Sequence, residues 1–104
     1  MRDEAIKSRI TETQDSLVVE IGLRIKKLRT DSDLTQQGLA DILGLSRAAV
    51  TQWENGQATC SFAQALELEA IFNVDVGFIL FGREYGKLRN PAEAARSRRE
   101  AIAA

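Results

Sequence analysis

The 104-residue sequence contains no histidine, one cysteine (Cys60) and one proline (Pro91). The absence of histidine excludes serine–histidine and cysteine–histidine catalysis and histidine-ligated metal sites. A lone cysteine cannot form an intrachain disulfide or a multi-cysteine metal site, which fits a reducing cytoplasm. Because the only proline lies late in the sequence, nothing before it forbids long helices. We therefore expect a cytoplasmic protein, not an enzyme, without cofactor or metal.

Long hydrophobic runs are also missing. The longest candidate, Val76–Phe81, is far shorter than the ~20 apolar residues that cross a bilayer. The first ten residues mix charged and apolar side chains and lack the apolar region of a signal peptide. Apolar residues make up 44% of the chain, enough for the modest core of one domain. We expect no membrane partner.

Neither sign of charge dominates, since the net charge is −1, but the charges are distributed unevenly along the chain. Residues 17–82 carry eight acidic and five basic side chains, whereas residues 83–104 carry six basic and three acidic ones. A nucleic-acid binder is commonly basic, so any DNA contact here must come from a local surface. The acidic centre leaves a protein partner possible.

Helical periodicity and capping residues divide the centre of the chain into five predicted helices. The first follows an apolar stripe from Leu17 to Thr30, and the others are Gln36–Leu43, Arg47–Glu54, Phe62–Phe72 and a short helix after Asp75. The predicted caps and stops are Thr35, Gly44, Ser46, Asn55-Gly56, Ser61 and Asn73. These signals predict an all-α fold.

Both ends of the chain are open to two interpretations. Ile6 and Ile10 extend the first apolar stripe backwards, or the first thirteen residues form a mobile arm, which is either disordered or wraps DNA. The last residues are a solvated tail or attract phosphates through their arginines. We predict an extension over residues 1–14, a domain over residues 15–82 and a basic tail over residues 83–104.

The most informative feature is a helix, a tight turn at Gly44-Leu45 and a second helix that begins after Ser46. A short connection of this kind makes two helices cross steeply, so that the second one protrudes. The phrases LTQQGLADILGLSRAAVTQWENG and NVDVGFILFG, in this register, resemble the lambda-repressor-like helix-turn-helix family, also called the Xre or Cro/C1 type. The resemblance covers Leu17–Gly82.

The resemblance implies a five-helix, lambda-repressor-like DNA-binding domain with N- and C-terminal extensions. It assigns base contacts to the helix that begins at Arg47, through Arg47, Ala48 and Gln52 with Thr51 beside them. It assigns phosphate contacts to Gln36, Ser46 and Asn55, and a structural ion pair to Arg29 and Glu54. Arginine suits guanine, a methyl group suits thymine and glutamine suits adenine in the major groove, which agrees with these roles.

The chain also departs from the family pattern. Cys60 replaces a usual proline, so the turn before the fourth helix should be less rigid. Glu69 occupies a position that is usually small and apolar, so it is either partly exposed through a local rotation or paired with a cation.

The short helix before Gly82 is too apolar to face inward on all sides. Part of it should therefore be exposed. In the family that the chain resembles, this region often joins two subunits, so the resemblance implies a dimer interface at Val76, Phe78, Ile79 and Phe81. The hypothesis is a homodimeric transcriptional regulator, acting as a repressor, that reads an inverted repeat in double-stranded DNA. The alternative is an antitoxin or adaptor whose helix-turn-helix fold mainly binds a partner protein.

Overall fold

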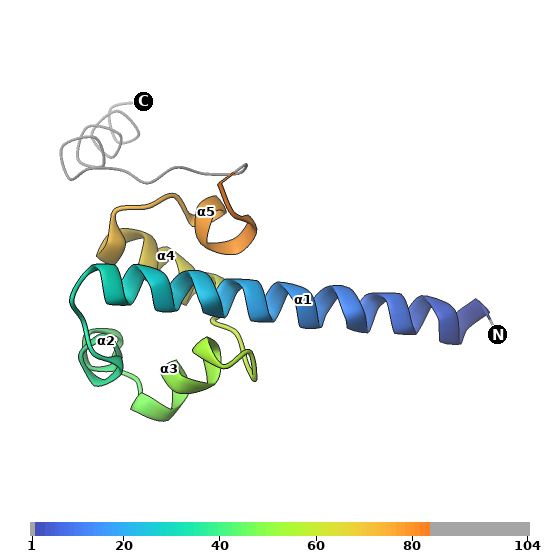
Figure 1. Ribbon diagram of the computed structural model, residues 1–104, viewed down its shortest axis with the longest axis horizontal. Helices are drawn as coiled ribbons and strands as arrows, with labels where there is room; N and C mark the ends of the chain where they lie inside the picture. Colours follow the sequence, from blue (N-terminus) through green and yellow to red (C-terminus); the bar gives the residue numbers. More distant parts are fainter. Residues whose placement is uncertain (1, 84–104) are drawn as a thin grey trace. The chain divides into compact units, whose positions relative to one another are not determined.

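A computed structural model describes residues 2–83 (Figure 1). This part of the chain holds five helices and no strand, and the fold is therefore all-α as predicted. The helices are α1 (Arg2–Asp31), α2 (Gln36–Leu43), α3 (Arg47–Glu54), α4 (Phe62–Phe72) and α5 (Val76–Phe81). None of these helices is long and apolar enough to cross a membrane. The basic tail and its arginines lie almost entirely outside the described residues.

The described chain forms two compact units, residues 2–60 and residues 61–83. The first unit contains α1, α2 and α3, and α3 packs against both of the other helices. In the second unit, α4 packs against α5.

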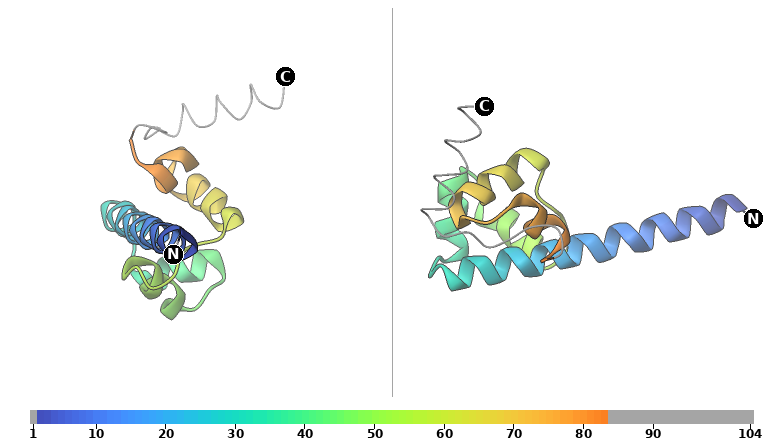
Figure 2. Two further views of the ribbon diagram at one scale, coloured as in Figure 1. Left: turned by 90° about the vertical axis from the view of Figure 1, so that its right-hand side faces the viewer. Right: turned by 90° about the horizontal axis from the view of Figure 1, so that it is seen from above.

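The first helix is much longer than its central apolar stripe requires, because α1 runs without a break from Arg2 to Asp31 (Figures 1 and 2). The structure therefore favours the backward extension over a mobile arm. Asp3 and Glu4 lie in the first turn, where carboxylates interact favourably with the helix dipole. Residues 2–16 are all exposed. Figure 1 shows α2 and α3 beside the later half of α1 only.

The later half of α1 is fixed by a core and by one very close approach. Ile21, Ile25 and Leu28 are buried on one stripe of the helix. A Cβ atom on Gly22 would lie 1.9 Å from the carbonyl oxygen of Trp53 in α3. Only glycine allows two backbones to approach this closely. The crossing of α1 and α3 therefore depends on this glycine, which the sequence analysis did not identify.

The second unit shows how the unusual Glu69 is accommodated. Ser61 caps α4 in a capping box with Gln64, and Asn73 ends it in the left-handed conformation. Asp75 occupies the N-cap position of α5, but its side chain makes no capping hydrogen bond. Instead, a carboxylate oxygen of Glu69 accepts a hydrogen bond of 2.7 Å from the backbone N–H of Val76. Glu69 is half-buried, which agrees with the partial exposure that was one of the two alternatives, and its carboxylate binds the start of α5.

Candidate nucleic-acid interface

The turn between α2 and α3 sets the geometry of the candidate interface. Thr35 caps α2 by accepting a hydrogen bond from the N–H of Gly38, and Gly44 ends α2 with φ of +68°. The N–H of Leu45 then bonds to the carbonyl oxygen of Ala40, which closes the turn. Ser46 caps α3 by accepting from the N–H of Ala49. Because glycine adopts positive φ without strain, Gly44 makes this abrupt change of direction possible.

The two sides of α3 have opposite characters. Val50, Trp53 and Glu54 are buried. On the other side, the predicted base-contacting residues Arg47, Ala48 and Gln52 are exposed and Thr51 is half-buried. Ser46 and Asn55, at the two ends of the helix, are exposed as well. The described chain therefore presents this side of α3 to solvent.

A buried ion pair joins α1 to α3. The Nε and Nη2 atoms of Arg29 donate to the two carboxylate oxygens of Glu54 at 2.7 and 2.9 Å, and Nη1 donates to the carbonyl oxygen of Leu34 at 2.7 Å. Both residues are buried. The hydrogen bonds with Glu54 raise the pKa of Arg29 above its ordinary value, although burial acts in the opposite direction. A two-pronged geometry of this kind is the arrangement in which a buried pair is tolerated.

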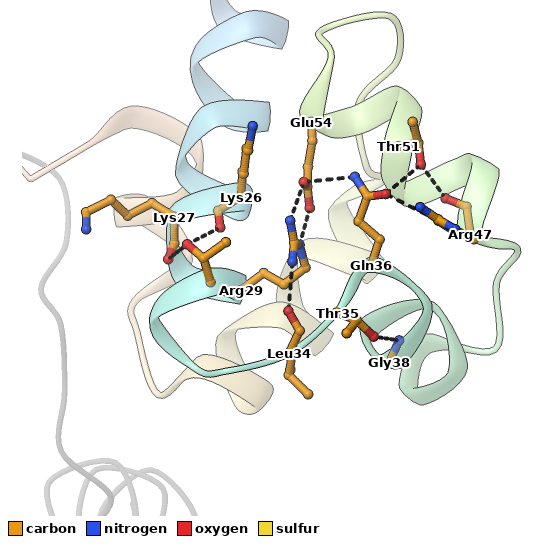
Figure 3. Close-up of polar contacts among 11 residues, drawn as sticks. Lys26, Lys27, Arg29, Leu34, Thr35, Gln36, Gly38, Arg47, Thr51 and Glu54 are labelled. Carbon is orange, nitrogen blue, oxygen red and sulfur yellow. Dashed lines mark hydrogen bonds and ion pairs between the residues drawn. The ribbon is translucent and has the colours of Figure 1, made fainter.

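Gln36 connects this ion pair to the exposed side of α3 (Figure 3). Its Nε2 donates to Glu54 at 3.2 Å, while its Oε1 lies 3.1 Å from the hydroxyl of Thr51 and 3.4 Å from Nε of Arg47. The amide has one sensible orientation here, because reversing it would place its oxygen against a carboxylate. The side chain of Gln36 is therefore held at the junction of α2 and α3.

An open hollow lies at this junction. It is lined by Arg29, Thr35, Gln36, Gln37 and Arg47. In the first turn of α2, the hydroxyl of Thr35 accepts from the N–H of Gly38, and the carbonyl oxygen of Thr35 accepts from the N–H of Leu39. The other N–H groups of this turn have no partner within the helix. Side-chain amides, guanidinium groups and the free N–H groups at a helix N-terminus are typical partners of phosphate oxygens.

The structure separates the predicted subunit-contact residues of α5. Phe81 is 55% exposed and Val76 and Phe78 are half-buried, whereas Ile79 is completely buried. Two further large apolar side chains of the same unit are exposed, Phe62 at 67% and Leu66 at 44%. Sequence analysis missed these two because helical periodicity indicates a stripe on α4 but not which of its sides is covered.

The link through Gln36 was also missed. Gln36 and Glu54 are 18 residues apart, and nothing in their local sequence indicates that their side chains meet. The sequence indicated only the position of each residue separately, with Gln36 at the start of one helix and Glu54 at the end of another.

Comparisons with known proteins agree with this geometry. The family model described as "Helix-turn-helix" matches residues 25–79. The chain is 32% identical over 66 residues to the HTH-type transcriptional activator BcrR of Enterococcus faecalis, covering 64% of this chain and 32% of that protein. It is 33% identical over 64 residues to the uncharacterized HTH-type transcriptional regulator YqaE of Bacillus subtilis (strain 168), covering 62% of this chain and 55% of YqaE. The match thus spans a third to a half of these relatives.

A solved structure shares the fold. The restriction-modification controller protein C.AhdI from Aeromonas hydrophila is 32% identical in sequence, with a TM-score of 0.55. The similarity covers 60% of this chain and 94% of C.AhdI.

Proposed function

Because the chain belongs to the lambda-repressor-like, or Xre (Cro/C1-type), family of helix-turn-helix proteins, we propose that it is a sequence-specific DNA-binding regulator of transcription, acting as a repressor. The observation that carries this proposal is the exposed side of α3, which is tied to a buried ion pair through Gln36. An α-helix with one free side fits the major groove of B-DNA.

In the proposed complex, the exposed side of α3 reads base edges. Arg47 lies in the first turn of the helix, and its Nε is held by Gln36, which leaves its terminal nitrogens for the O6 and N7 atoms of a guanine. Ala48 contacts a thymine methyl group and Gln52 pairs with an adenine. Thr51 contributes less, because its hydroxyl lies within hydrogen-bond distance of both Gln36 and the carbonyl oxygen of Arg47.

Phosphate contacts then fix the position of α3 on the duplex. The hollow at the start of α2 receives one phosphate, with Gln36 donating through the second hydrogen of its Nε2. Ser46 keeps its hydroxyl hydrogen for another, since its oxygen accepts the capping bond. Asn55, exposed at the end of α3, makes the contact at the other side of the groove.

We propose that two subunits bind together. The described residues of the second unit leave Phe62, Leu66 and Phe81 exposed, and large exposed apolar side chains on a small domain commonly take part in subunit contacts. Val76 and Phe78 extend the proposed contact, while Ile79 is buried and serves the core. A two-fold dimer would place its recognition helices about one DNA turn apart, ~34 Å, and read an inverted repeat.

Selection of bound duplexes from a random pool, with a salt titration of the selected site, tests this proposal. We expect an inverted-repeat consensus and an affinity that falls steeply with salt, because phosphate contacts release counterions. A pool without consensus, together with a second protein that co-purifies in fixed ratio, would favour the antitoxin or adaptor function.

A further inference from the structure

The carboxylate of Glu54 binds a second partner besides Arg29. Its Oε2 accepts from Nε of Arg29 at 2.7 Å, and its Oε1 accepts from Nη2 of Arg29 at 2.9 Å and also from Nε2 of Gln36 at 3.2 Å. The side chain of Glu54 is only 2% exposed, so these hydrogen bonds are made inside the protein. The ion pair accounts for the contacts with Arg29 but not for the contact with Gln36.

The bond to Glu54 decides which end of the Gln36 amide faces α3. A carboxylate accepts hydrogen bonds and cannot donate, so it holds the Nε2 end of the amide. The Oε1 end is thereby turned toward α3, as Figure 3 shows, where it lies 3.4 Å from Nε of Arg47 and 3.1 Å from the hydroxyl of Thr51. A buried charge therefore sets the direction of an amide that contacts the exposed side of α3.

Of the two groups on α3, Arg47 depends on this direction and Thr51 does not. A guanidinium group has only donors, so only the oxygen of the amide can hold it. A hydroxyl both donates and accepts, so Thr51 can bond to either end of the amide. Reversal of the Gln36 amide would therefore release Arg47 and leave Thr51 bonded.

An arginine that is already held discriminates bases better than a free one. A long side chain loses rotamer freedom when a contact immobilises it, and this loss weakens the contact. Because Gln36 restricts Arg47 before DNA binds, less of this cost falls on the contact with the correct base. A free Arg47, which is exposed, could instead reach neighbouring phosphates, and that would favour every sequence alike.

We propose that Glu54 is a positioning residue for base recognition. By orienting the amide of Gln36, it holds Arg47 toward one base pair and sets how strongly α3 discriminates at that position. The inference rests on the proposed function, since it concerns the same side of α3. It gives the buried Glu54 a part in sequence specificity in addition to its ion pair with Arg29.

The readout is a ratio of two affinities of the full-length protein, measured by fluorescence anisotropy. One is for the selected duplex, and the other is for a duplex changed at the position where Arg47→Ala loses discrimination. Glu54→Gln keeps the shape of the side chain but offers one oxygen in place of two, so the direction of the Gln36 amide is no longer fixed. We expect the ratio to fall about two- to tenfold.

A ratio separates this role from a purely structural one, because partial unfolding lowers both affinities by the same factor. Ile25→Ala is the control, since it lowers stability through the core. It should keep the wild-type ratio. An unchanged ratio in Glu54→Gln would overturn the inference, and so would an equal fall of the ratio in Ile25→Ala.

Gln36→Leu breaks the same link and leaves the ion pair intact, so it tests the inference even if Glu54→Gln does not fold. Leucine can neither accept from Arg47 nor donate to a phosphate. We expect weaker binding of all duplexes and, in addition, a ratio that is about two- to tenfold lower. In an Arg47→Ala protein, the same change should weaken all duplexes alike. A wild-type ratio in Gln36→Leu would contradict the inference.

Failure of this inference can be told apart from failure of the proposed function. If Arg47→Ala abolishes a wild-type preference that Glu54→Gln and Gln36→Leu both retain, only the role of Glu54 is wrong. A wild-type protein without any base preference would overturn the proposed function and this inference together.

Discussion

The two halves of α1 belong to one unbroken helix and carry one apolar stripe, yet only the later half is covered. In that half, Ile25 is completely buried and Gly22 admits the backbone of α3. In the first half, Ile10 on the same stripe is half exposed. Helical periodicity therefore shows that a helix has an apolar side. Whether that side is buried or exposed depends on which other helices pack against it.

The largest expected difference concerns the ion pair that anchors the later half. Glu54→Ala should lower the free energy of unfolding by about 3–5 kcal/mol, because it leaves the guanidinium of Arg29 buried without its carboxylate. The matched control is Glu20→Ala, which removes a partly exposed pair with Arg24 at 3.8 Å and should cost less than about 1 kcal/mol. Denaturant titration measures both. Equal losses would mean that the pair with Glu54 is not structural.

The stripe itself offers a comparison of identical residues. Ile25→Ala should cost about 2–5 kcal/mol, since it opens a cavity in the core. Ile10→Ala, on the same line of the helix, should change the free energy of unfolding by no more than about 0.5 kcal/mol. A large loss for Ile10→Ala would show that the first half is covered in the free protein.

Replacing Gly22 should change the free energy of unfolding less, because two contributions of opposite sign partly cancel. Gly22→Ala improves helix propensity, but its methyl group would meet the carbonyl of Trp53, and we expect a net loss of about 1–3 kcal/mol. Ser16→Ala, exposed on the same helix, is the control and should be neutral or slightly stabilising. Thermal unfolding compares the two, and a stabilised Gly22→Ala protein would rule out the close crossing of α1 and α3.

Removal of residues 2–14 should have the smallest effect. Since every described side chain there is exposed, the free energy of unfolding should change by less than about 1 kcal/mol, and the affinity for the selected duplex should stay the same. Loss of helical signal in circular dichroism, without a change in the unfolding midpoint, is the expected pattern. A lower midpoint would place this extension in the folded core.

Much of the fold was predictable because its signals are local. Thr35, Ser46 and Ser61 were identified as caps from residue type and spacing, and the helices begin where these residues predict. The sequence did not decide the full length of α1. Ile6 and Ile10 continue the apolar stripe, but the sequence does not indicate whether another element packs against them. The role of Glu69 was not predictable, since it depends on the N–H of Val76 seven residues later in a separate helix.

The candidate site divides in the same way. The exposed side of α3 follows from helical spacing alone, since Val50 and Trp53 mark the buried side. The connection from Glu54 through Gln36 to Arg47 required coordinates, because it joins side chains that only the crossing of α2 and α3 brings together. The DNA contacts themselves stay predictions.

The central claim is that the exposed side of α3 discriminates bases. The most direct measurement is the affinity of wild-type and Arg47→Ala proteins for a set of duplexes that carries every single-base change of the selected site. The account predicts that Arg47→Ala loses about 1–3 kcal/mol of binding and no longer distinguishes the base at one position of each half-site, with discrimination elsewhere retained. Uniform weakening across the whole set would contradict the account, because Arg47 would then contact only phosphate.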